Sequence, residues 1–417
     1  MILTERLACG AELLLEPVDR TDTLCIGFWY PYGSRDEKDG EHGYCHFLEH
    51  MLFKGTRSRT AFQIAQQIDR VGGYINAFTE KETTCVYVVI PKEHIRLAYE
   101  VLTDMAGFSM LDEKEMEKEK TVVVNEILSI DDSPEEKGHE LYIKELWDGH
   151  PLARKITGEV EEVEGITRAG LEGFYRSRFT PSVIAVAGNF DPAEARALSN
   201  AVYAEGKRPP EPPRRERPVT ARFTDFAADR FTQAHIYAGT SYPLSRDISH
   251  YYTSLLFSTA FGESMSSRLF QKLREELGLC YSVYSFRTFF SDIGQLTIYA
   301  NATPKLAGRL LEALNGELKS ITRDPMSAEA IADAKSHLIG SMILSKEDME
   351  SRMKRLVRQN EMIDRVLEFE ESVAMIGKVS MADVEKFVST YLKSSVFSLL
   401  VFGVKKVSAM RGFTFDF

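Results

Sequence analysis

Hydrophobic positions in the first half of the chain follow the spacing of strands in some segments and of helices in others. Residues 2–16 predict a β-hairpin, because apolar runs flank the turn dipeptide Cys9-Gly10. Apolar runs bounded by turn residues predict four more strands, at 22–30, 73–80, 83–91 and 182–188. Apolar residues at helical spacing predict helices at 60–71, 93–107, 112–131, 166–176 and 191–204. A loop at 31–43 leads into a further helix that contains residues 46–50.

The second half repeats this order in outline. Strands are predicted at 231–239, 280–288, 293–302 and 395–402, and helices at 246–262, 265–276 and from 304 to about 392. Residues 166–188 resemble residues 379–403, since each segment is a helix, a short turn and an apolar strand that ends in Gly. The pattern indicates a duplicated fold.

A second internal match concerns one helix of each half. Leu111–Ile127 can be laid on Met326–Met342, which places Ser341 opposite Glu126. The second half has no histidine between positions 250 and 337, so it cannot copy a histidine-based metal site from the first half. We therefore expect one chemical half and one half without a metal.

The length of 417 residues predicts two domains of roughly 200 residues each. Four prolines lie within residues 206–215, a concentration that is typical of a linker. We predict an N-terminal metal-binding catalytic domain at 1–207, a Pro-rich linker at 208–222 and a homologous C-terminal domain without metal at 223–417.

Composition narrows the class of protein. Hydrophobic residues make up 44% and charged residues 27%, which is typical of a soluble globular protein. The net charge of -11 argues against general nucleic-acid binding. Five scattered cysteines without a Cys-x-x-Cys pair predict reduced thiols and a cytoplasmic location. We see neither a signal-peptide pattern nor an apolar run of transmembrane length, so no membrane is expected as a partner.

The stretch His46-Phe47-Leu48-Glu49-His50 carries the candidate chemistry. On a helix, His46 and His50 lie one turn apart on the same face, where two imidazoles can bind one metal ion. A zinc ion bound by two histidines needs a third protein ligand and an open position for water. Glu49 can then act as a general base toward that water. The order His-x-x-Glu-His is an inverted form of the common zinc peptidase motif.

Two ordinary helix histidines would also produce this pattern. They would be expected in polar or mixed surroundings, whereas residues 43–53 are strongly apolar around the three polar side chains. Burying two histidines and a glutamate is costly unless they are paired or bind a metal. The surroundings therefore favour a metal site.

Two carboxylates on the helix predicted at 112–131 are candidates to complete the site. Glu126 lies among apolar residues and is our choice for the third metal ligand. Glu119 precedes it by seven residues, on the same helical face, and is our choice for the carboxylate that orients a ligand histidine. The alternative is a solvated acidic face, since three more glutamates crowd this helix, and the spacing leaves both interpretations open.

The motifs together resemble the pitrilysin/insulinase family of zinc peptidases. The matching segments are HFLEHMLFKGT at 46–56, Glu126 with 75 residues between it and His50, GYINAFT at 73–79, DDSP at 131–134 and SMSSRLF at 264–270. Arg274 and Tyr281 stand seven apart, as the substrate-binding pair of that family does. The resemblance covers nearly the whole chain. It is strongest to the branch of the mitochondrial processing peptidase β subunit and its short bacterial relatives.

This resemblance implies a fold and a metal site. The fold would be α+β, with two homologous domains, each a mixed β-sheet with flanking helices, arranged as a clamshell around a polar chamber. His46, His50 and Glu126 would bind one zinc ion per chain, with Glu49 as the general base and Glu119 in its orienting role.

The resemblance also implies how a peptide is bound. Asn76 and Ala77 would belong to an edge strand that pairs with the backbone of the substrate. Arg274 and Tyr281 would bind substrate from the second domain, and Tyr281 would help to stabilise the oxyanion. Without the family, these two residues would be taken for a surface arginine on a helix and an aromatic residue in a strand.

We therefore expect a cytoplasmic zinc endopeptidase that cleaves oligopeptides or unfolded segments, with peptide substrate as its partner. The short branch predicts a homodimer, with a heterodimer with an inactive homologue as the alternative. A non-catalytic scaffold or regulatory subunit of a processing complex is the second hypothesis, and the intact metal and base residues argue against it. A metal-binding protein without hydrolytic activity would leave Glu49 unexplained.

Overall fold

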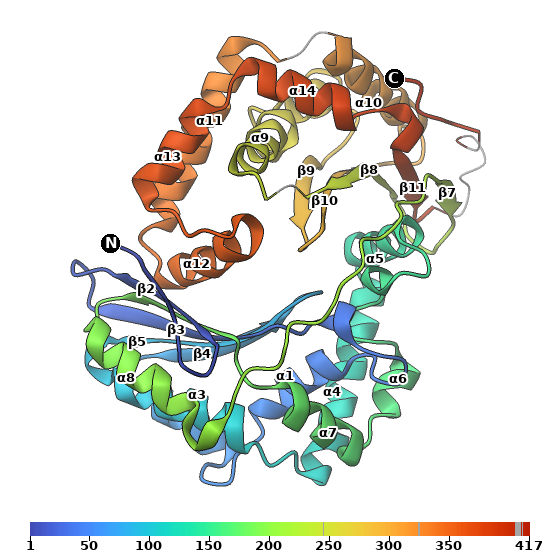
Figure 1. Cartoon of the computed structure of the whole chain (residues 1–417). Helices are drawn as coiled ribbons and strands as arrows, with labels where there is room; N and C mark the ends of the chain where they lie inside the picture. The colour runs from blue at the N-terminus through green and yellow to red at the C-terminus, as the bar shows by residue number, and fades with distance from the viewer. Residues whose placement is uncertain (245, 324–325, 405–409, 411) are drawn as a thin grey trace. The chain divides into compact units, whose positions relative to one another are not determined.

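A computed structural model of the chain describes residues 1–244, 246–323, 326–404, 410 and 412–417 (Figure 1). Contacts divide the chain into two compact units. Unit 1 comprises Met1–Ser129, Arg154–Arg215 and Leu344–Glu368. Unit 2 comprises Ile130–Ala153, Glu216–Ile343 and Phe369–Phe417.

Unit 1 is built on a six-stranded mixed sheet with the order β1-β2-β6-β3-β5-β4. Its strands are β1 (Leu3–Arg6), β2 (Glu12–Pro17), β3 (Thr23–Tyr30), β4 (Tyr74–Thr79), β5 (Thr84–Pro91) and β6 (Val183–Gly188). The pair β2–β6 is parallel and the other pairs are antiparallel. Strand β4 forms an edge of the sheet.

Most helices of unit 1 lie on the same side of this sheet (Figure 1). They are α1 (Tyr44–Leu52), α2 (Ala61–Asp69), α3 (Ile95–Phe108), α4 (Glu113–Asp132, which ends in unit 2), α6 (Val160–Glu164), α7 (Arg168–Arg178) and α8 (Pro192–Val202). Leu13, Ile26 and Phe28 of the sheet are buried against Leu48 of α1 and Leu102 of α3. The apolar runs and the helical spacing that predicted these elements therefore correspond to residues that are buried in the fold.

Unit 2 is built on a five-stranded mixed sheet with the order β7-β11-β8-β10-β9. Its strands are β7 (Thr224–Ala227), β8 (Ala234–Pro243), β9 (Val283–Phe289), β10 (Ile293–Ala302) and β11 (Ser398–Phe402). Its helices are α5 (Pro134–Leu146), α9 (Ile248–Ser258), α10 (Ala307–Arg323), α11 (Ala328–Ser345, which ends in unit 1), α13 (Phe369–Lys378) and α14 (Met381–Tyr391). Two π-helical segments span Thr259–Glu263 and Phe270–Glu276.

The duplicated fold is confirmed by the topology of the sheets. The order β2-β6-β3-β5-β4 in unit 1 has the same sequence of connections as β7-β11-β8-β10-β9 in unit 2. In each sheet only the first of these pairs, β2–β6 or β7–β11, is parallel. The α+β class with two homologous mixed sheets is therefore also confirmed.

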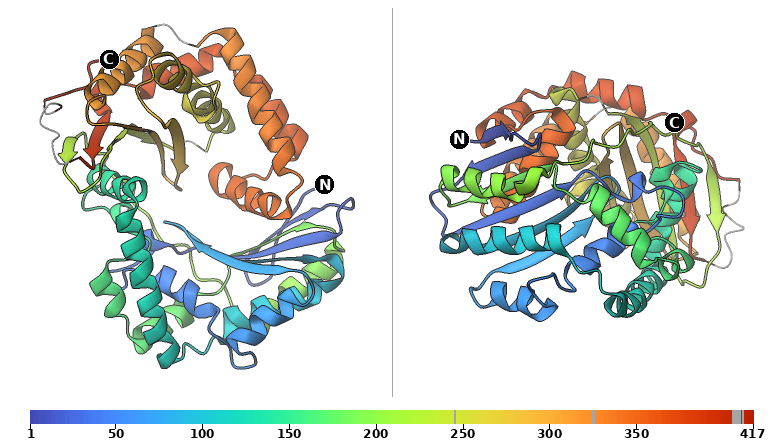
Figure 2. Two further views of the ribbon diagram at one scale, coloured as in Figure 1. Left: turned by 180° about the vertical axis from the view of Figure 1, so that it is seen from behind. Right: turned by 60° about the horizontal axis from the view of Figure 1, so that its bottom comes forward.

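Each unit includes a helix from the other half of the sequence. Helix α12 (Met349–Ile363) packs on the face of the unit 1 sheet opposite to α3 and α8, as Figures 1 and 2 both show. Helix α5 packs on the unit 2 sheet, with Tyr142 and Leu146 in the same core as Tyr237. Each sheet therefore has a second apolar face that is covered by a helix from a distant part of the chain.

Two glycines allow these helices to approach closely. A Cβ atom on Gly27 of β3 would lie 2.6 Å from Sδ of Met353 in α12. A Cβ atom on Gly138 of α5 would lie 2.6 Å from the ring of Tyr237 in β8. Both separations are shorter than van der Waals contact, so a side chain at Gly27 would displace the end of Met353, and one at Gly138 would meet the rigid ring of Tyr237.

The predicted elements match these bounds with a few differences. Helices α5 and α6 and strand β7 were not predicted, and β9 begins at Val283 rather than at residue 280. Residues 207–223, which include the predicted linker, contain neither helix nor strand. Within the described residues, no helix is both long enough and apolar enough to span a membrane.

Candidate metal centre

Helix α1 presents the His-x-x-Glu-His motif with its apolar side turned into the core of unit 1. Phe47, Leu48 and Met51 are fully buried on that side. The rings of His46 and His50 lie on another side of the helix, with their centroids 4.6 Å apart. The local sequence thus explains the arrangement, because one helical turn separates the two histidines and apolar residues fix the orientation of the helix.

Glu126 of α4 lies opposite both histidines. Its Oε1 is 3.6 Å from Nε2 of His46, and its Oε2 is 3.6 Å from Nε2 of His50. A charge-assisted hydrogen bond would be shorter, at about 2.7–2.9 Å. Two ligand atoms bound tetrahedrally at about 2.1 Å from zinc would lie about 3.4 Å apart, close to the observed spacing. Among the described residues, these three form the only group of His, Cys, Asp or Glu suited to hold a metal.

Glu119 is buried and joins two other residues of the site. Its Oε1 lies 2.9 Å from Nδ1 of His50, and its Oε2 lies 2.5 Å from Nζ of Lys54. When the Nδ1–H group of His50 donates a hydrogen bond to Glu119, Nε2 keeps its lone pair for a metal. The buried position does not fit the alternative of a solvated acidic face at Glu119.

The two other carboxyls have opposite pKa shifts. The polar contact from His46 lowers the pKa of Glu126, while partial burial acts in the other direction. Burial raises the pKa of Glu49, although the hydroxyl of Thr79 donates a hydrogen bond to its Oε2. A carboxylate that stays ionised suits a metal ligand, and one with a raised pKa suits proton transfer near neutral pH.

Asn76 and Ala77 lie in the edge strand β4, as the resemblance implies. They pair with Tyr87 and Val86 of β5 on the inner side. The N–H of Ala77 donates a 2.9 Å hydrogen bond to the side chain of Asn76, which is exposed. A peptide that added to this edge would compete with that local hydrogen bond.

Arg274 and Tyr281 lie next to each other in unit 2. The guanidinium of Arg274 is 5.3 Å from the ring centroid of Tyr281 and 4.6 Å from that of Phe270. Tyr281 is 77% exposed and precedes β9 rather than lying in it. Because both residues belong to unit 2 and the histidines to unit 1, their part in the site stays a prediction.

Two further residues contact the carboxyl groups of the site and were not predicted. Lys54 lies two positions beyond the end of α1 and pairs with Glu119 of α4, a contact that depends on how the two segments pack. Thr79 hydrogen-bonds Glu49 across 30 positions of the chain. The pairing of β4 with β5 places Thr79 next to Glu49. No local sequence pattern predicts this contact.

Comparison with known proteins decides the family. The sequence model described as Insulinase (Peptidase family M16) matches residues 14–160, and the one described as Peptidase M16 inactive domain matches residues 165–338. An uncharacterized zinc protease of Mycobacterium bovis is 34% identical over 402 residues, which cover 94% of this chain and 91% of that protein. The chain belongs to peptidase family M16.

Other M16 proteins agree with this assignment. The uncharacterized zinc protease YmxG of Bacillus subtilis is 33% identical over 394 residues, covering 91% of this chain and 93% of that protein. A structure described as a peptidase M16 inactive domain from Pseudomonas fluorescens superposes with a TM-score of 0.89 at 18% identity, covering 97% and 98% of the two chains. A protease from Helicobacter pylori gives 0.87 at 18% identity, covering 97% and 99%. These two structures share the fold.

Proposed function

We propose that this M16 chain is a zinc-dependent endopeptidase that hydrolyses oligopeptides or unfolded segments. The observation that carries the proposal is the convergence of His46, His50 and Glu126, with Glu49 beside them on the same helix. The names of the M16 relatives as zinc proteases support the choice of metal. One zinc ion per chain would be held by the two imidazoles and the Glu126 carboxylate.

The residues around the site fit hydrolysis of a peptide bond. When bound, zinc would polarise the scissile carbonyl and lower the pKa of the attacking water. Glu49 accepts a proton from that water and passes it to the leaving amine, and its raised pKa favours this exchange. Thr79 holds the carboxylate of Glu49, and Glu119 holds the imidazole of His50.

We propose that the substrate binds as an extended strand. The edge strand β4 offers Asn76 and Ala77 for backbone pairing, which selects unfolded segments because folded proteins rarely expose a free backbone. Arg274 and Tyr281 would bind the same peptide, with Tyr281 near the developing oxyanion. An enclosed chamber and a homodimer complete the proposal, and the five free cysteines support a reducing, cytoplasmic compartment.

The test combines metal content with cleavage of a quenched-fluorescent peptide library. We compare the wild-type chain with Glu49→Gln and Glu126→Gln, each with and without a chelator. We expect about one zinc per chain and chelator-sensitive cleavage for the wild type. Glu49→Gln should keep zinc and lose cleavage, whereas Glu126→Gln should lose both.

Two outcomes would contradict the proposal. Full cleavage by Glu49→Gln would exclude that residue as the base. Zinc binding by the wild type without any cleavage would favour the alternative of a non-catalytic scaffold or regulatory subunit. It would also call for repeating the assay with an added homologous chain as heterodimer partner.

A further inference from the structure

Helix α1 carries both candidate histidines, yet the residue at its N-cap position has no side chain that could cap the helix. The first N–H groups of a helix have no partner within the helix, and a Ser, Thr, Asp or Asn side chain usually accepts from them. Here the N-cap is Gly43, which has a φ of 82°. A Cβ atom at this position would lie 2.8 Å from the carbonyl oxygen of Thr157, so no capping side chain can be placed there.

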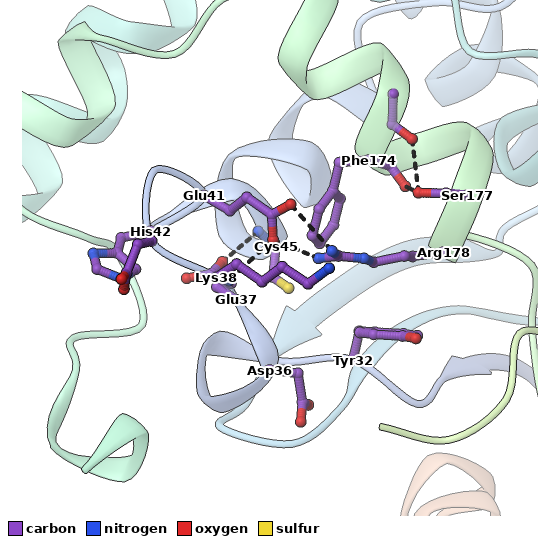
Figure 3. A network of polar contacts seen from close by, with 12 residues as sticks. Tyr32, Asp36, Glu37, Lys38, Glu41, His42, Cys45, Phe174, Ser177 and Arg178 are labelled. Atoms are coloured by element: carbon purple, nitrogen blue, oxygen red, sulfur yellow. Dashed lines mark hydrogen bonds and ion pairs between the residues drawn. The ribbon is translucent and has the colours of Figure 1, made fainter. Parts of the chain in front are cut away.

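Glu37 supplies this cap from the preceding loop. Its Oε2 accepts a 2.9 Å hydrogen bond from the N–H of Gly43, and its Oε1 accepts a 2.7 Å bond from the N–H of Cys45 (Figure 3). Glu37 is only 3% exposed. One carboxyl group thus accepts hydrogen bonds from two N–H groups at the helix start, which is the task of an N-cap side chain.

The loop that carries Glu37 is itself anchored to unit 1. A guanidinium nitrogen of Arg154 donates to the backbone carbonyl of Glu37. Arg178 of α7 makes two hydrogen bonds to Glu41, of 2.6 and 3.1 Å, and its guanidinium lies 4.7 Å from the ring centroid of Phe174. Glu37 therefore connects the start of α1 to a fixed part of the fold.

We propose that Glu37 is a positioning residue that holds the first turn of α1 so that His46 faces Glu126. Cys45, whose N–H donates a hydrogen bond to Glu37, directly precedes His46. His50 lies one turn further and is held separately by Glu119. Loss of the hydrogen bonds from Glu37 should therefore displace His46 more than His50. The distance between Nε2 of His46 and Oε1 of Glu126 should increase.

The chemistry of the site explains why glutamate is required. A glutamine has one acceptor oxygen, so its NH₂ group would face one of the two N–H donors. An aspartate is shorter by one methylene and cannot reach both N–H groups from the same backbone position. Both variants leave one buried N–H without a partner, which is costly.

The experiment measures zinc affinity of the full-length chain by competition with a chromophoric chelator, for wild type, Glu37→Gln and Glu37→Asp. Asp39→Asn is the matched control, because it makes the same change from acid to amide in the same loop at a side chain that is 98% exposed. Its surface ion pairs with Arg154 and His42 are expected to contribute little. We expect about tenfold weaker zinc binding for Glu37→Gln, as for other residues that orient ligands, and less than twofold for the control. Hydrogen exchange at the Cys45 N–H should become faster in Glu37→Gln.

Unchanged zinc affinity in Glu37→Gln would overturn the inference, even if the variant melts at a lower temperature, because that result assigns Glu37 a role in stability alone. If Glu37→Gln does not fold, Glu37→Asp provides the test, and wild-type affinity in that variant has the same meaning. The inference rests on the proposed metal site but not on peptide cleavage. A wild-type chain that binds zinc without cleaving peptides would refute the proposed function and leave this test valid.

Discussion

Replacing Glu119 by Gln tests whether this buried carboxylate increases the affinity of the site for zinc. In the wild type it accepts a 2.9 Å hydrogen bond from Nδ1–H of His50 and pairs with Lys54 at 2.5 Å. The amide of Gln can still accept from His50, but it has no charge. The imidazole therefore becomes a weaker ligand, and Lys54 loses its ionic partner.

The magnitude follows from the hydrogen bond that changes. A bond to a charged group contributes about 1.5–3 kcal/mol, and a neutral one about 0.5–1.5 kcal/mol. The difference of about 1–1.5 kcal/mol corresponds to roughly tenfold weaker zinc binding. Glu119→Ala removes both bonds and should weaken binding by about a hundredfold, the upper end for residues that orient ligands.

Competition with a chromophoric zinc chelator at fixed pH measures this change. Glu117→Gln is the matched control, since it lies on the same helix with a side chain that is 66% exposed and pairs only at the surface with Lys120. Its zinc affinity should change by less than about twofold. Equal affinities for Glu119→Gln and wild type, with Glu126→Gln clearly weaker, would refute an orienting role for Glu119.

Three further predictions concern packing, the base and pH. Leu356→Ala leaves a cavity at a fully buried position of α12 and should lower the free energy of unfolding, measured in urea, by about 2–5 kcal/mol. Leu344→Ala is the control: its side chain is 77% exposed, and the free energy of unfolding should change by less than about 0.5 kcal/mol. Thr79→Val removes the hydrogen bond to Glu49 and should lower kcat about ten- to hundredfold, with the zinc content unchanged. A change in KM alone would contradict a role of Thr79 in orienting the base. Burial raises the pKa of Glu37 from 4.5 to about 8, so the folded chain binds a proton there more tightly than the unfolded chain. Stability to urea should therefore fall as the pH rises from about 4.5 to 8, and Glu37→Gln should make this slope shallower; an identical slope in the variant would show that other groups cause it.

Much of the local structure can be read directly from the sequence. The strands follow from short apolar runs bounded by turn residues, because strands of a sheet covered on both faces are buried throughout. The helices follow from helical spacing, because each buries one side. The two histidines of α1 are neighbours by helical geometry alone. The duplication is also visible in the sequence, since both halves repeat the same order of elements.

Contacts between distant segments could not be predicted in this way. Spacing left Glu119 and Glu126 open between a metal site and a solvated acidic face, and their distances to the histidines depend on how α4 packs against α1. The hydrogen bond from Thr79 to Glu49 depends on the position of β4 in the sheet. Glu37 looked like one of several charged residues in a loop, and its role as a cap depends on the positive φ of Gly43 and on the nearby backbone of Thr157.

Helices α5 and α12 separate the information that is local in the sequence from the information that arises when the chain folds. The apolar stripe of α12 is a local property, and it predicts a helix with one buried side. The stripe does not identify the surface that buries it, because hydrophobic burial is non-directional and any apolar face of suitable shape would serve. Close packing against Gly27 and Trp29 of β3 selects the sheet of unit 1 for α12, and the corresponding fit of α5 at Gly138 selects that of unit 2.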